Sequence, residues 1–199
     1  MMKNILYALK LDSQFYSEIE RRASSTKGAL LIVMLSGLGI GLVTGTFRTG
    51  PFPIIVVLLL WSIWSYFASV IAKKFIKEPN SASEWINMLR GMGYGFSPLL
   101  LYPIILIPIS TAKPVVTVII YMWVMASCTV AIKQASLSRG IIKPAIVAAV
   151  SFLLAYLLFA PIVAIFGSNI LSISWITEPK GVIAGMTLLL LLVILFLRK

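Results

Sequence analysis

Long runs of apolar residues alternate with short polar segments along most of this chain. Six runs of about 16 to 23 residues contain no Asp, Glu, Lys or Arg. About 20 residues of helix are needed to cross ~30 Å of hydrocarbon, and backbone amides in lipid must be satisfied within the helix itself. The pattern therefore predicts an all-α, polytopic transmembrane helical bundle of about six spans. The runs are residues 28–47, 52–72, 91–109, 114–132, 144–166 and 182–197, the last being short for a full span.

The segment before the first run has a different pattern. Residues 1–27 lack the apolar run of a signal peptide, and Asp12 or Ser13 is placed to cap a second short helix. We expect an N-terminal, cytoplasmic amphipathic helix that lies in the membrane interface or packs under the bundle. Residues 28–199 form the bundle as a single domain. The apolar positions that recur at helical spacing are Ile5, Leu6, Leu9, Phe15, Tyr16 and Ile19.

Basic residues between the runs predict the orientation. The chain is 60% hydrophobic and 12% charged, and its mean hydropathy is +1.02. With the N-terminus inside, 14 of the 17 Lys and Arg fall on the cytoplasmic side, and Arg48, Lys113 and Lys180 fall outside. This positive-inside bias predicts that both termini are cytoplasmic, in the cytoplasmic membrane if the cell is prokaryotic. It also explains the net charge of +11 without nucleic-acid binding.

The residue inventory excludes most active-site chemistry. The chain has no His, one Cys and six acidic residues, and none of those acids lies in an apolar run. Ser-His triads, Cys-His pairs and HExxH zinc sites are therefore ruled out, and intramembrane aspartyl or two-metal chemistry lacks its carboxylates. We expect no enzyme activity, no cofactor and no metal. Cys128 is interpreted as a small packing residue.

The third run carries the candidate functional motif. Three glycines within five residues, followed by prolines, weaken a helix, and irregular backbone at membrane depth needs protein or a water-filled cavity around it. The third span should therefore be central and broken. Broken helices line binding sites in transporters, but a kinked helix that accommodates a neighbour is the main interpretation. The motif consists of Arg90, Gly93, Tyr94, Gly95, Ser97 and Pro98.

A glycine stripe marks the first run. Gly37, Gly41 and Gly45 recur every four residues, so they share one face of a helix. Small residues let membrane helices approach closely, which predicts helix packing through this face. Packing within the chain is the main interpretation, and a homo-oligomer is the second.

Together these segments resemble the Yip-domain family, the Ypt-interacting protein one group, in its short bacterial and archaeal form. The likeness covers about residues 10–170. It rests on the amphipathic lead 11–19, on residues 26–30 at the start of the first run, on the motif at 90–98, and on Trp123, 131–135 and Arg139. The resemblance implies a five-span core, to which this chain adds one.

What the resemblance implies about function is membrane organisation. Eukaryotic members are associated with Rab-type GTPases, vesicle traffic and membrane shaping. Their Asp-Leu-Tyr-Gly-Pro motif is missing from this chain, in which residues 48–52 are the most similar segment. We expect a non-enzymatic protein that organises the bilayer, anionic lipids included, or an unidentified membrane or cytoplasmic protein partner. The alternative is a small permease or lipid-handling protein built around the broken third span, with a cavity lined by Tyr94, Ser97, Tyr102, Ser127 or Thr129.

Overall fold

The computed structural model describes residues 2–45, 51–76, 84–106 and 113–166, with side chains as far as residue 159. These residues form helices, and no strand occurs among them. In chain order the elements are α1 (Met2–Leu9), α2 (Ser13–Arg21), α3 (Ser25–Thr44), α4 (Phe52–Phe75), α5 (Trp85–Gly95), the 3₁₀ helix η2 (Ser97–Leu106), α6 (Lys113–Ala135) and α7 (Ile142–Phe166).

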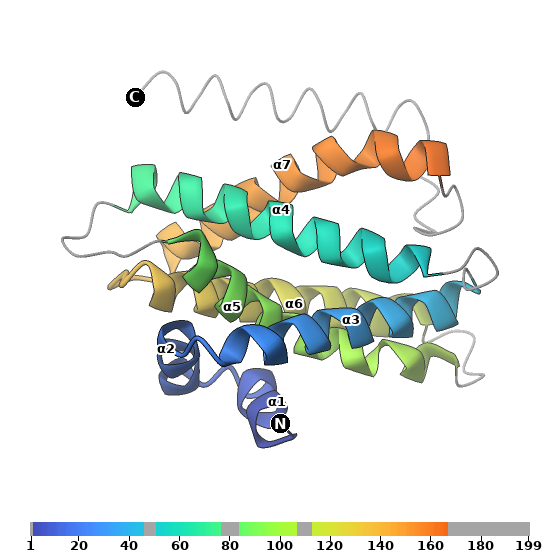
Figure 1. Cartoon of the computed structure of the whole chain (residues 1–199), viewed down its shortest axis with the longest axis horizontal. Helices are drawn as coiled ribbons and strands as arrows, with labels where there is room; N and C mark the ends of the chain where they lie inside the picture. The colour runs from blue at the N-terminus through green and yellow to red at the C-terminus, as the bar shows by residue number, and fades with distance from the viewer. Residues whose placement is uncertain (1, 46–50, 77–83, 107–112, 167–199) are drawn as a thin grey trace.

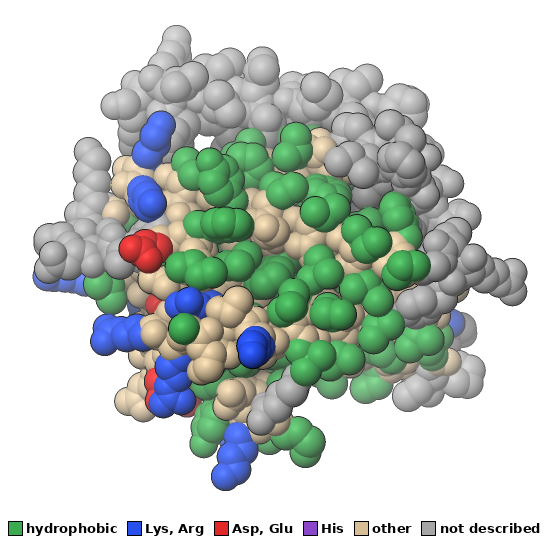
Figure 2. All heavy atoms as spheres, in the orientation of Figure 1, with side chains coloured by type: hydrophobic (Ala, Val, Ile, Leu, Met, Phe, Trp, Pro, Cys, Tyr) green, Lys and Arg blue, Asp and Glu red, His purple; other side chains and the backbone are tan. Residues whose placement is uncertain are grey.

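Four of these helices are long and apolar enough to cross a membrane, namely α3, α4, α6 and α7. Their outward faces carry large apolar side chains at helical spacing, such as Val118, Ile119 and Met122 on α6, each more than half exposed. Figure 2 shows apolar side chains across the middle of one face, with Lys and Arg gathered toward one end. Such a surface suits hydrocarbon rather than water. The predicted all-helical class is confirmed for the described residues, and four of their helices are suited to a membrane by length and composition.

The third apolar run is broken, as the sequence predicts. The α-helix α5 ends at Gly95, and the chain continues as the 3₁₀ helix η2, with Pro103 inside it. At 1.5 Å and 2.0 Å of rise per residue, the two pieces extend by about 16 Å and about 20 Å. Placed end to end they are long enough to cross a bilayer. The sixth run, 182–197, lies outside the described residues.

Helix α5 and the start of η2 occupy the centre of the bundle. Helix α3 runs beside α4 and also along both α5 and η2, while α6 lies between α5 and α7 (Figure 1). Helix α5 contacts α2, α3, α4 and α6. The central position predicted for the third run is therefore confirmed for residues 91–99, which are all buried. The later part of η2 differs from the prediction, because Leu101, Ile104 and Leu106 are exposed at the edge of the bundle. Protein surrounds the backbone at the break itself, which favours its stability in a membrane.

The N-terminal segment forms a hairpin, α1–α2, that packs against the side of the bundle (Figure 1). Asp12 caps α2, because its Oδ1 accepts hydrogen bonds from the backbone N–H groups of Gln14 (2.9 Å) and Phe15 (3.3 Å). The end of α1 is held by Trp123, in the middle of α6, whose Nε1 donates a hydrogen bond to the Leu9 carbonyl at 3.1 Å. The hairpin therefore contacts α6 from its middle toward its C-terminal end.

Candidate functional site at the junction of α2, α5 and α6

The six-residue motif predicted from the sequence is adjacent to the break in the third element. Arg90, Gly93, Tyr94 and Gly95 belong to α5, while Ser97 and Pro98 begin η2. Every residue from 91 to 99 is buried, and Arg90 is half-buried at the outer end. The motif is thus a buried segment with one charged residue at its rim.

Two glycines of the motif permit very close helix contacts. A Cβ placed on Gly93 would lie 2.6 Å from the Cβ of Ala29 in α3, and one on Gly95 would lie 2.8 Å from the Sγ of Cys128 in α6. Both separations are shorter than a normal contact. Helices α3 and α6 therefore approach α5 so closely that a hydrogen atom is the largest side chain that fits without movement.

Tyr94 joins the hairpin to the bundle. Its ring is 3% exposed and meets Phe15 of α2 edge to face, with the ring centroids 5.5 Å apart. Its hydroxyl lies over Gly28 of α3, where a Cβ would come within 2.1 Å of the oxygen. One aromatic side chain on α5 thus packs against both α2 and α3.

Polar groups at the break are satisfied inside the protein. The Ser97 hydroxyl donates to the Tyr94 carbonyl at 2.6 Å, which bridges the end of α5 and the start of η2. From α3, the Ser36 hydroxyl lies 2.8 Å from the Ile32 carbonyl and 3.3 Å from the Phe96 carbonyl. Proline at 98 has no N–H to satisfy. These contacts explain how an interrupted helix is tolerated at this depth.

All five residues expected to line a transport cavity are buried in the structure, namely Tyr94, Ser97, Tyr102, Ser127 and Thr129. The transport function stays a prediction. Among the described residues, no three His, Cys, Asp or Glu side chains gather where they could hold a metal ion.

The three glycines of the stripe on α3 do not all serve helix packing. A Cβ on Gly37 would lie 2.8 Å from the Ile54 Cα, so this glycine brings the α3 and α4 backbones together. Gly41 is buried. Gly45 differs from the prediction, since it is exposed, ends α3 with φ +68°, and has nothing within 4 Å of a Cβ position. Its left-handed backbone conformation makes it a C-terminal helix cap rather than a packing residue.

Arg90 fastens three helices together. Its Nη1 donates to the Glu20 backbone carbonyl near the C-terminal end of α2 (2.9 Å), and its Nε donates to the Thr26 hydroxyl in the first turn of α3 (2.9 Å). The Asn87 Oδ1 on α5 lies 3.4 Å from Nη1. A cation at a helix C-terminus is also favoured by the helix dipole.

Arg90 binds the backbone carbonyl of Glu20, whereas the Glu20 side chain lies against Gly91. Glu20 is 6% exposed. A Cβ added to Gly91 would lie 3.3 Å from the Oε1 of Glu20 and would also contact Ala131 of α6. This oxygen has no hydrogen-bond partner among the described residues. Burial raises the pKa of Glu20 to about 9, although the positive charge of Arg21 and the backbone of Ala135 act in the opposite direction. Glu20 is therefore protonated at neutral pH.

Glu20 lies outside the apolar runs, but its burial was not predicted from the sequence. The residue belongs to α2, which packs in the bundle against α5 and α6. A signal was present in the sequence, because Glu20 follows Tyr16 by four residues and so shares the apolar face of α2. Glu18, by contrast, lies on the polar face, where it forms an ion pair with Arg22.

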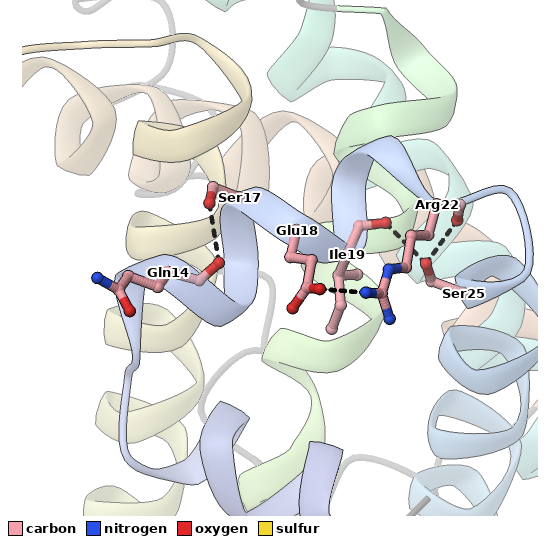
Figure 3. A network of polar contacts seen from close by, with 6 residues as sticks. All are labelled: Gln14, Ser17, Glu18, Ile19, Arg22 and Ser25. Atoms are coloured by element: carbon pink, nitrogen blue, oxygen red, sulfur yellow. Dashed lines mark hydrogen bonds and ion pairs between the residues drawn. The ribbon is translucent and has the colours of Figure 1, made fainter.

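The turn between α2 and α3 is held by Ser25. Its buried hydroxyl lies 2.7 Å from the Ile19 carbonyl and 2.5 Å from the Arg22 carbonyl. Figure 3 shows Ser25 turned back toward the end of α2, while Glu18 and Arg22 reach toward each other. The hairpin is thus attached to the bundle by this turn, by Arg90 and by Trp123.

Comparison with known proteins gave no match. No family model matches the chain, and neither a curated protein nor a solved structure does so.

Proposed function

We propose that this protein is a non-enzymatic, multi-pass membrane protein that organises the bilayer around it and a membrane or cytoplasmic protein partner, as its resemblance to the Yip-domain family implies. The observation that carries the proposal is the outer face of α1. Membrane traffic or shaping is the process that the resemblance suggests, and its partner is to be identified by experiment.

The outer face of α1 combines apolar and basic side chains. Met2, Leu6 and Tyr7 are 78%, 56% and 46% exposed, and Lys3 and Lys10 are exposed beside them. The opposite face is fixed to the bundle, where Ala8 is fully buried. An apolar face flanked by lysines suits a membrane interface that contains anionic lipid, because each basic residue near such a surface contributes about 1 kcal/mol.

The distribution of charge supports the proposed orientation. Because successive spanning elements alternate in direction, the last turns of α4 and α6 lie at the same end of the bundle as the first turns of α3 and α7. We propose that this end is cytoplasmic, that both termini lie there, and that residues 182–197 form a sixth span. Lys113, at the start of α6, lies at the opposite end. The basic residues at the shared end are Arg21, Arg22, Lys27, Lys73, Lys74, Lys133, Arg139 and Lys143.

The lipid-contacting role of α1 can be tested with a fluorescent label. In the full-length protein, with the buried Cys128 replaced by alanine, bimane is attached to Leu6→Cys or, as a control on the exposed polar face of α2, to Gln14→Cys. The protein is reconstituted in phosphatidylcholine vesicles, with or without phosphatidylglycerol, that carry a nitroxide on the acyl chain. We expect quenching at residue 6 to be at least about twofold stronger than at residue 14 and to increase with anionic lipid. Equal quenching at both positions, or no effect of phosphatidylglycerol, would contradict the proposal.

A further inference from the structure

The burial of the Glu20 side chain on the inner face of the hairpin is costly if the carboxyl group is charged. Glu20 is 6% exposed as a residue, and its Oε1, which has no hydrogen-bond partner among the described residues, lies against Gly91 of α5 and Ala131 of α6. Burying an ionised carboxylate without a partner is very unfavourable, so the docked hairpin requires this group to be neutral. The same carboxyl would be hydrated if the hairpin left the bundle.

We propose that Glu20 is a proton-binding site that controls the α1–α2 hairpin, which docks on α5 and α6 when Glu20 is protonated and is released when Glu20 ionises. The two states differ in one proton on one carboxyl group. Release would expose the surface of α5 and α6 around Gly91, Tyr94 and Ala131, which lies against Glu20 and Phe15. This inference concerns the hairpin itself and goes beyond the lipid-organising role proposed above.

Among the charged groups on α2, Arg21 favours the ionised carboxylate of Glu20, but burial outweighs it. The guanidinium of Arg90, on α5, is bound to the backbone carbonyl of Glu20 and to Thr26 of α3. On α6, Lys133 is half-buried, and on α2, Arg21 is exposed. Glu18 is already paired with Arg22 on the outer side of α2, and Lys27 of α3 is exposed. Among the described residues, Glu20 takes part in no ion pair.

The direction of the pH effect follows from the two protonation states. The docked hairpin holds Glu20 with a pKa of about 9, because of burial, whereas a hydrated glutamate has its ordinary pKa near 4.5. Between these values the docked state binds one proton more than the released state. The ratio of released to docked hairpin therefore rises about tenfold per pH unit across this range and becomes constant above about pH 9.

Protonation of Glu20 is tested directly with dicyclohexylcarbodiimide, an apolar reagent that reacts with protonated carboxyl groups. In the full-length protein at pH 7, peptide mass spectrometry should find the adduct on Glu20, and labelling should decline toward pH 9. Glu20→Gln should remove it, while Glu18→Gln, on the exposed face, should leave it unchanged. Labelling that is absent at Glu20, or that reaches only the exposed acids, would overturn the proposal.

Release of the hairpin is tested with the native Cys128, which is fully buried and lies near Tyr16 of α2. Its alkylation by N-ethylmaleimide requires exposure and then thiolate formation, which itself rises about tenfold per pH unit below a pKa near 8.5. From pH 6 to pH 8 we expect the rate to rise about 10⁴-fold in the natural chain and about 10²-fold in Glu20→Gln. Equal slopes in the two proteins would overturn the proposal.

A second cysteine separates hairpin release from general opening of the bundle. Ala8 on α1 is fully buried against the bundle, so Ala8→Cys in a Cys128→Ala background reports from the hairpin side of the same contact. The same pair of slopes is expected at this position. If Cys128 becomes reactive with pH while Ala8→Cys does not, the bundle opens without the hairpin and the proposal is wrong.

Discussion

Gly93→Ala is expected to destabilise the protein by about 2–3 kcal/mol, the upper part of the range for overpacking a tight core. The added methyl group would lie 2.6 Å from the Ala29 Cβ and 3.2 Å from its Cα. Neither atom can rotate away, so α3 must move from α5. Thermal unfolding of the purified protein in a mild detergent, followed by tryptophan fluorescence, measures the loss. The matched control is Gly140→Ala, because a Cβ there meets nothing within 4 Å.

The origin of that loss can be checked by moving the methyl group across the interface. Ala29→Gly removes the Cβ that a methyl group on residue 93 would strike, so the double variant Ala29→Gly with Gly93→Ala should recover most of the stability. A double-mutant cycle isolates this term. If Gly93→Ala is as stable as Gly140→Ala, or if the double variant is no better than the single one, the close approach of α3 to α5 is incorrect.

Arg90→Met is expected to lower the free energy of unfolding by about 2–3 kcal/mol, since hydrogen bonds to charged groups contribute about 1.5–3 kcal/mol each and this side chain is only half-buried. The substitution keeps an apolar stem of similar length but removes the donors to the Glu20 carbonyl and the Thr26 hydroxyl. The hairpin should become more sensitive to proteolysis near the α2–α3 turn, because that turn loses its connection to α5.

The control for Arg90 is Arg139→Met, which removes the same charge from an exposed position. Arg90→Lys should lie between the natural chain and Arg90→Met, because lysine keeps the charge but cannot contact two acceptors with a planar fork. Limited proteolysis and thermal unfolding measure all three variants. Equal behaviour of Arg90→Met and Arg139→Met would show that Arg90 does not hold the three helices together.

The spanning helices could be predicted from the sequence because their signal is local. Runs such as 52–72 are long, apolar and free of charge, and α4 follows directly from them. The break in the third run was also predictable, since its glycines and prolines have the same consequence in any helix. The central position of residues 91–99 followed from the requirement that irregular backbone be surrounded by protein, but the exposed later part of η2 did not follow from it.

The candidate site could be predicted only in part, because its remaining features depend on tertiary contacts. Arg90 was identified, but its partners in α2 and α3 lie about 60 to 70 residues away in the sequence. The burial of Glu20 depends on where the hairpin docks, and a single acid on an apolar face does not fix that position. Gly45 shares the spacing of Gly37 but lies just past the end of its helix.

The central claim, that the basic end of this bundle is cytoplasmic and that the broken third element crosses the membrane, is tested most directly by cysteine accessibility. In a Cys128→Ala background, single cysteines replace Lys73, Lys113 or Arg139, all of which are exposed. Sealed right-side-out vesicles are then treated with a membrane-impermeant maleimide. Residue 113 should be labelled at once, and residues 73 and 139 only after the vesicles are permeabilised. Labelling of residues 73 and 113 from the same side would contradict the account.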